Sequence, residues 1–276
     1  MVFDALGNDI NSENLSIHTD SGNLIKYSDD TMLMHRIMKT TAQIDQSAYQ
    51  KNVQQIADTS ESKNLKLNEA KCEEMTFHHC NIKNQGVLTA MQQDLIINDK
   101  AIRRADHVKY LGVMMSRKMN WTAHVNHIVK KVNWIIKGLA RIVPYLTMNK
   151  KIIIFKQIIV PNILYASEVW GAAILKKDRK KIKKLLAFYS TVSSVDTSLL
   201  ITTLNEQYQQ RFHNYIEKIR KDSNHPLHNQ IVKQQQNHYS TRRQMKVMFC
   251  RTKKYQTSFL PTAIAYLCDR TNVTLI

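Results

Sequence analysis

Residues 24–34 read LIKYSDDTMLM, and this stretch decides how the first part of the chain folds. Apolar residues flank the polar centre Ser28-Asp29-Asp30, a pattern that predicts two short strands joined by a turn. Mg²⁺ prefers carboxylate oxygens, and two such ions can hold the attacking and leaving oxygens of a phosphoryl transfer. Taken alone, residues 27–30 fit an ordinary acidic turn better, because Asp is common in turns.

The rest of the chain up to residue 118 predicts a small β-rich unit with one long helix. Between 41 and 63, apolar residues recur at helical intervals. After this helix, short apolar or alternating runs are separated by polar turns, which is typical of strands. Strands are expected at 64–68, 74–77, 95–97 and 108–115, with turns at 69–71 and 98–100.

From Trp121 onward the apolar residues follow the period of a helix, and this change predicts a domain boundary near residue 118. Pro144 is expected to end the first helix, because proline interrupts the hydrogen-bond ladder. Four cations lie off the apolar stripe of this helix: Lys130, Lys131, Lys137 and Arg141. Further helices are expected at 149–170 with a bend near Pro161, at 176–190 and at 208–220.

The charge of the chain is unevenly distributed. The 276 residues include 40 Lys+Arg and 22 Asp+Glu, a net charge of +18. Residues 1–60 carry 4 basic and 8 acidic side chains, whereas residues 117–184 carry 16 basic and 2 acidic ones. This asymmetry predicts one segment that could hold divalent cations and another that could hold a polyanion, although basic runs are also common on solvated helix faces.

Two tryptophans accompany the cations of the first helix. Trp121 and Trp134 could stack on bases. Aromatic residues at such positions more often fill a core, so the sequence favours buried positions for both. The basic run 176–184 offers a second surface for phosphates.

Several other classes of protein are disfavoured. The sequence contains no GxGxxG and no Walker-type lysine loop. Its four cysteines do not form a disulfide framework, which favours an intracellular, reducing setting. We expect no membrane span, because the longest apolar run, 152–160, is too short, and we see no secretory signal. Cys72, His78, His79 and Cys80 could bind zinc, but incidental residues are the favoured interpretation.

Five segments in order resemble the palm and thumb of a non-LTR (LINE-type) retrotransposon reverse transcriptase. Ser28 replaces the Ala that is usual in the Tyr-x-Asp-Asp hairpin of this family. The resemblance covers roughly residues 8–190. The segments are LIKYSDDTMLM (24–34, the hairpin), NLKLNEAKCEEM (64–75, the next palm motif), HVKYLGVMMSRKMNW (107–121, the primer grip), HVNHIVKKVNWIIKGLARI (124–142, the first thumb helix) and ILYASEVWG (163–171, a segment after the thumb).

The resemblance implies roles for the residues of the hairpin and of the motif that follows it. Asp29 matches the carboxylate that binds Mg²⁺, and Asp30 is its neighbour, which tunes the metal site. Tyr27 is expected beneath the primer terminus. Lys71 matches a lysine that is a candidate general acid for the departing pyrophosphate, and a solvent-facing turn lysine is an equally good interpretation.

The resemblance also implies how nucleic acid is held. Tyr110, Leu111 and Gly112 match the core of the primer grip, where glycine allows the backbone to approach the primer strand closely. The cations of the first thumb helix would bind phosphates of an RNA template and a DNA primer without reading sequence.

A polymerase of this kind needs a further metal-binding Asp on a strand about a hundred residues before the hairpin, together with the fingers. Asp4 superficially resembles that residue, but it lies only 25 residues before Asp29. Residues 3–10, FDALGNDI, match better an apolar stretch of the family that ends in Asn-Asp. The first catalytic carboxylate is therefore expected to be absent from these residues.

The sequence thus predicts an α+β fold with three parts. Residues 1–118 form a partial palm with a small antiparallel sheet and a helix, 119–190 a helical thumb, and 191–276 a basic helical extension. The predicted function is that of a fragment of an RNA-directed DNA polymerase that does not polymerise alone. The alternatives are a non-enzymatic nucleic-acid-binding remnant, or a chain that folds poorly because its sheet exposes an unpaired edge.

Overall fold

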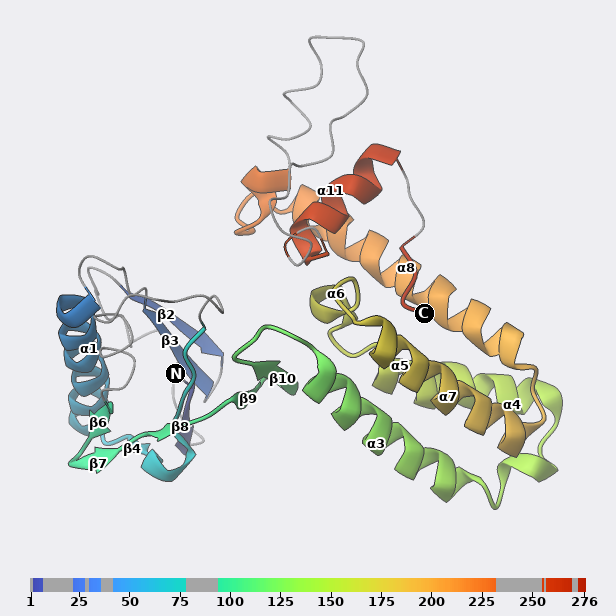
Figure 1. Cartoon of the computed structure of the whole chain (residues 1–276), viewed down its shortest axis with the longest axis horizontal. Helices are drawn as coiled ribbons and strands as arrows, with labels where there is room; N and C mark the ends of the chain where they lie inside the picture. The colour runs from blue at the N-terminus through green and yellow to red at the C-terminus, as the bar shows by residue number, and fades with distance from the viewer. Residues whose placement is uncertain are drawn as a thin grey trace, which may run out of the picture. The chain divides into compact units, whose positions relative to one another are not determined.

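The computed structural model describes residues 2–6, 22–27, 30–35, 42–77, 94–231, 255, 257–269 and 273–276. The chain divides into two compact units, Met1–Met119 and Asn120–Ile276 (Figure 1). The turn residues Ser28 and Asp29, the segment 78–80 and the polar tract 234–237 lie outside the described residues.

The predicted hairpin is confirmed. Strands β2 (Gly22–Tyr27) and β3 (Asp30–His35) pair antiparallel, with Tyr27 opposite Asp30 next to the connecting turn. The buried Leu33 anchors β3 in the core of the first unit, whereas Met34 beside it is exposed. The alternation between these faces is the period of two that a strand imposes.

A strand at the beginning of the chain, β1 (Val2–Leu6), was not predicted. It pairs antiparallel with the second edge of β3, with Asp4 opposite Asp30. Both edges of β3 are therefore paired. The alternative of a chain that folds poorly requires an unpaired edge instead. The main sheet has the strand order β2-β3-β1-β5-β8, and β4 pairs with β1.

The remaining strands of this sheet are shorter than predicted. β4 (Lys66–Leu67) and β5 (Glu73–Glu74) flank a 3₁₀ turn at Glu69–Lys71. β5 pairs in parallel with β8 (Arg103–Arg104), so the sheet is mixed and not purely antiparallel.

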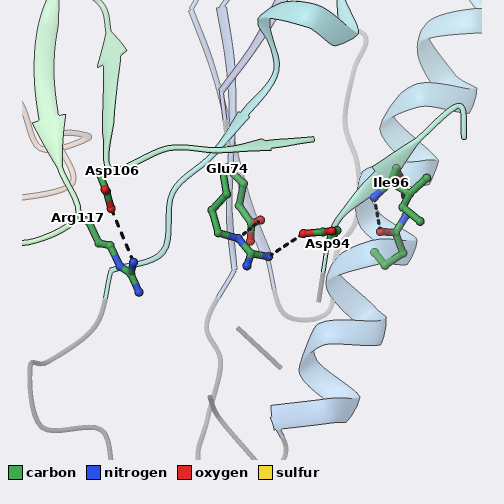
Figure 2. A network of polar contacts seen from close by, with 7 residues as sticks. Glu74, Asp94, Ile96, Asp106 and Arg117 are labelled. Carbon is green, nitrogen blue, oxygen red and sulfur yellow. Dashed lines mark hydrogen bonds and ion pairs between the residues drawn. The ribbon is translucent and has the colours of Figure 1, made fainter. Parts of the chain in front are cut away.

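Helix α1 (Ala42–Ser62), predicted at 41–63, provides one side of the core of the first unit. The side-chain amide of Gln50 also holds strand β6 (Ile96–Ile97), because it donates to the carbonyl of Ile96 at 2.7 Å and accepts from its N–H at 2.9 Å (Figure 2). β6 pairs with β7 (Lys100–Ala101). The core consists of Leu33, Tyr49, Val53, Ile56, Ala57, Cys72, Leu95, Ile97 and Ile102.

Ion pairs connect the short strands at the surface of this unit. Arg104 binds the buried carboxylate of Glu74 at 3.1 Å and lies 3.7 Å from Asp94 (Figure 2). Lys100 binds Glu69 at 2.6 Å, so the strand pair β6–β7 is tied to the 3₁₀ turn. These long-range polar contacts therefore add to the few backbone hydrogen bonds between the short strands.

Residues 108–115 form a hairpin and not the single predicted strand. β9 (His107–Tyr110) and β10 (Val113–Ser116) pair antiparallel around Leu111 and Gly112. Both turn residues have positive φ, 46° and 79°, as a two-residue hairpin turn requires. The sequence did not predict this turn, because leucine rarely adopts a positive φ and Leu111 is therefore not a typical turn residue.

In the second unit, α3 (Thr122–Leu139) buries the predicted apolar stripe, namely Val125, Ile128, Val132 and Ile136. His124 is also buried, and the edge of its ring meets Trp170 with centroids 5.3 Å apart. Burial, and then nearby His127, lowers the pKa of His124 to about 4, so this imidazole is neutral at pH 7. Pro144 lies in a 3₁₀ turn, Val143–Tyr145, after the helix has ended.

The predicted bend near Pro161 takes the form of a π-helical turn. Helix α4 (Met148–Ile154) continues through this turn, Phe155–Ile159, into α5 (Val160–Ile163). Proline has no N–H to donate to a preceding carbonyl, and local rearrangement of the ladder is the usual result.

A close contact explains the glycine after α6 (Ser167–Trp170). A Cβ atom at Gly171 would lie 2.6 Å from the carbonyl oxygen of Ser167 and 2.7 Å from the hydroxyl of Tyr208. Tyr208 belongs to α8 (Thr197–Lys221), which is much longer than the predicted 208–220. Only glycine lets α6 and α8 approach this closely.

The last described segments pack against α8. Helix α11 (Phe259–Asp269), which was not predicted, contributes Ala263 to a cluster with Phe212 and Ile216. The side chain of Asn205 accepts hydrogen bonds from the N–H groups of Leu275 and Ile276, at 3.1 and 3.2 Å. No helix among the described residues is long and apolar enough to cross a membrane.

A buried carboxylate connects α3 to α7 (Lys176–Ser193). Asp178 is fully buried, accepts from the hydroxyl of Thr122 at 2.7 Å and pairs with Lys181 at 2.8 Å. Lys181 also donates to Asn126 of α3 at 2.6 Å. The two helices therefore lie side by side, as Figure 1 shows.

We expect Asp178→Ala to lower the free energy of unfolding by about 1–3 kcal/mol, because it leaves polar partners unsatisfied. The exposed pair Glu217–Arg220 has the same i,i+3 spacing, and Glu217→Ala should cost less than about 0.5 kcal/mol. Urea denaturation of both variants measures the difference. Equal losses of unfolding free energy in the two variants would show that the buried contacts of Asp178 add no stability beyond that of an exposed pair.

Candidate functional site

Asp30 lies where three strands meet. It begins β3 and is partly buried, and its partners in register are Tyr27 of β2 and Asp4 of β1. The side chain of Tyr27 is 64% exposed, so its ring is available to a ligand. Asp29 lies outside the described residues, although both of its neighbouring strands belong to the sheet.

Tyr110 of the β9–β10 hairpin interacts electrostatically with Asp30 of the β2–β3 hairpin. From the sequence, only the family resemblance connects these two segments. Burial, and then the carboxylate of Asp30, raises the pKa of Tyr110 above its ordinary value. The Tyr110 hydroxyl is buried without a hydrogen-bond partner among the described residues. The structure thus brings together two predicted site segments, while the roles of their residues stay predictions.

Lys71 is exposed at the end of the 3₁₀ turn Glu69–Lys71. Exposure agrees with the interpretation of a solvent-facing turn lysine. Its role stays a prediction.

The described residues include no group of three or more His, Cys, Asp or Glu side chains that could hold a metal ion. Cys72 is fully buried, and its thiol donates to the carbonyl of Asn68 at 3.4 Å, which agrees with the interpretation that it is incidental. The chemistry of Asp29 and Asp30, both carboxylates, fits Mg²⁺.

Three of the four predicted phosphate-binding residues lie on α3, and Arg141 lies in the turn that follows this helix. Lys130, Lys131, Lys137 and Arg141 are all exposed, opposite the buried apolar stripe. Lys137 follows Lys130 by seven residues, about two turns of an α-helix, so these two lie on the same side of α3. The helix contains no acidic residue, so no carboxylate along it competes for these cations.

The two tryptophans differ, and the prediction of a core position is wrong for one of them. Trp121 is 8% exposed and contributes to the core, as predicted, whereas Trp134 is 78% exposed on the cationic face. The helical phase could have revealed this, because position 134 is four residues from Lys130 and only two from the buried Val132 and Ile136.

The basic run of α7 is partly used for internal contacts. Arg179 donates to the carbonyls of Thr274 and Leu275 at 2.9 and 2.6 Å. Lys181 pairs with Asp178 in the same way. The charges of Arg179 and Lys181 are therefore less available to a ligand. Five lysines of the run remain exposed: Lys176, Lys177, Lys180, Lys183 and Lys184.

Sequence comparison finds relatives among polymerases of mobile elements. The chain is 24% identical over 210 residues to the RNA-directed DNA polymerase from mobile element jockey of Drosophila melanogaster, a match that covers 70% of this chain and 21% of that protein. The jockey polymerase of Drosophila funebris is 23% identical over 172 residues, 56% of this chain and 18% of the relative. The probable RNA-directed DNA polymerase from transposon X-element of Drosophila melanogaster is 28% identical over 108 residues, with coverages of 37% and 11%.

The chain is therefore similar to part of the RNA-directed DNA polymerases of non-LTR retrotransposons. The predicted resemblance is thus confirmed, and the chain spans about a fifth or less of the length of these relatives. No protein-family profile matches the chain, and no solved structure matches it.

We expect Asp30→Asn to lower the pKa of Tyr110, because a neutral amide no longer opposes formation of the phenolate. Part of the elevation should persist, since burial is its larger cause. NMR of ¹³Cζ-labelled tyrosine, with the Tyr110 resonance assigned by Tyr110→Phe, measures this shift. Asp58→Asn removes an exposed carboxylate of α1 and serves as the control. An unchanged Tyr110 titration in Asp30→Asn would contradict the coupling.

Proposed function

We propose that this chain carries the segment of a reverse transcriptase that holds a primer–template and contributes part of the metal site. The observation that carries the proposal is the β2–β3 hairpin, whose register pairs Tyr27 with Asp30 at one end of the two strands. The relationship to polymerases of non-LTR elements supports it. In this proposal the first unit is a partial palm and residues 119–190 form the thumb.

At the hairpin, Asp29 and Asp30 would hold Mg²⁺, which when bound supplies positive charge to the oxygens of a phosphoryl transfer. The exposed ring of Tyr27 would support the nucleotide at the primer end. The primer strand would pass over Leu111 and Gly112, where a glycine leaves room for a close backbone approach. Lys71 would place its charge near the departing phosphate.

On the thumb, α3 would bind phosphates of the RNA template and the DNA primer. Lysine and arginine release condensed counterions when they contact phosphates, so binding depends on salt and not on base sequence. A non-enzymatic nucleic-acid-binding function is the second candidate, favoured by the exposed cations of α3 in a compact unit of its own.

We expect no primer extension by the purified 276-residue chain with Mg²⁺, deoxynucleotides and an RNA template annealed to a DNA primer. The family mechanism needs a further carboxylate on a palm strand, which we propose these residues do not supply. A gel assay for extended primer tests this. Extension that Asp29→Ala abolishes would show instead that the chain is a complete catalyst.

We expect the double variant Lys130→Gln/Lys131→Gln to weaken binding to oligonucleotides and to make it less sensitive to salt. Each lost phosphate contact should reduce the slope of log K against log salt concentration by about 0.7–0.9. Fluorescence anisotropy between about 50 and 200 mM salt provides the measurement.

Lys218→Gln/Lys221→Gln is the matched control, because it removes the same charge from exposed positions at the end of α8. Asp29→Asn should leave binding unchanged. If both lysine pairs change the slope equally, binding reflects net charge and α3 has no special role.

A further inference from the structure

The ring of Trp134 lies among the cations of α3. Lys130 and Lys131 precede it by four and three residues, Lys137 follows it by three, and Arg141 lies in the turn just beyond the end of the helix. No other tryptophan of the chain has comparable exposure, since Trp121 and Trp170 are 8% and 0% exposed. The cationic face therefore presents a large flat aromatic surface that does not contribute to the core.

The same face has a gap one turn beyond the ring. Gly138 lies four residues after Trp134, and a Cβ atom built there would meet no atom within 4 Å. Packing therefore does not require glycine at this position. Glycine is less favourable than alanine inside a helix, so the bare backbone beside the ring has a cost in stability.

We propose that Trp134 and the bare surface at Gly138 form a stacking site for an unpaired nucleobase. The four cations of the face would bind the phosphates on either side of that base. This inference rests on the proposed nucleic-acid binding of α3 and adds the class of ligand, a single strand of RNA or DNA. Aromatic side chains flanked by cations are the usual means of holding single strands without sequence preference.

An unpaired base, such as one in a single-stranded part of a template, fits the ring of Trp134 better than a paired base does. In a duplex the faces of the bases are stacked on one another, so lysines alone would be enough to bind its backbone. An exposed ring gains contact area only where a base is unpaired. The apolar stripe of α3 is buried, which leaves too little apolar surface for the helix to lie in a membrane interface.

The emission of Trp134 gives a direct test, because it belongs to the most exposed tryptophan. We would titrate the full chain with a 12-nucleotide strand of RNA, one of DNA, an abasic strand of equal length and a duplex. The base-containing strands should quench the emission, and the abasic strand should bind with little quenching. Anionic phospholipid vesicles, tested in parallel, should not shift the emission.

Substitution at the site should separate stacking from charge. Trp134→Ala should weaken binding of the base-containing strands roughly 10-fold or more, with a much smaller effect on the abasic strand. Gly138→Gln should act in the same direction, because its side chain would cover the bare surface. The matched control is Lys180→Gln on α7, which should affect all strands to a similar extent. Thermal melts confirm that each variant folds.

The outcomes distinguish this inference from the proposed function. If no strand binds, the proposed nucleic-acid binding itself fails. If Trp134→Ala weakens the base-containing and abasic strands equally, phosphate binding stands and the stacking site is wrong. A blue shift with anionic vesicles that exceeds the response to every oligonucleotide would assign the face to a membrane surface and overturn the inference.

Discussion

The burial of one stripe of α3 is the constraint on which the surface of the second unit depends. Each side chain of this stripe contributes about 1.5–3 kcal/mol when it is fully buried. A rotation of the helix by one residue, 100°, would bring cations toward the core and expose apolar side chains. The core therefore fixes the phase of the helix, and this phase directs the cations and Trp134 outward. The exposed cationic surface is a consequence of packing and needs no further structural device.

Pairing along β3 has the same role in the first unit. Because side chains alternate with a period of two, the burial of Leu33 sets which residues of β3 face the core. The register with β2 then leaves only Ser28 and Asp29 between the paired ends Tyr27 and Asp30. The two short strands thus place Asp30 at one end of the sheet, next to Asp29 in the sequence.

Sequence patterns were most reliable where the chemistry is local. The hairpin at 24–34, helix α1 and the buried stripe of α3 follow from spacing alone. Strand β1 could not be predicted, because its place depends on pairing with residues that are about 28 positions away. The β9–β10 turn was missed because Leu111 gives no turn signal. The prediction of a core position for Trp134 is wrong because tryptophan as a residue type favours burial, whereas the helical phase places position 134 outside the buried stripe.

Strand β1 also bears on the question of catalysis. Backbone N–H and C=O groups form the hydrogen bonds of a sheet whatever the side chains are. Residues 2–6 can therefore pair with β3 without being related to the strand that carries the first catalytic Asp in this family. The resulting register of Asp4 against Asp30 follows from hydrogen bonding of the main chain and is not a signature of chemistry. The exposed lysines of α3 belong to the second unit, and their outward direction depends on the core of that unit.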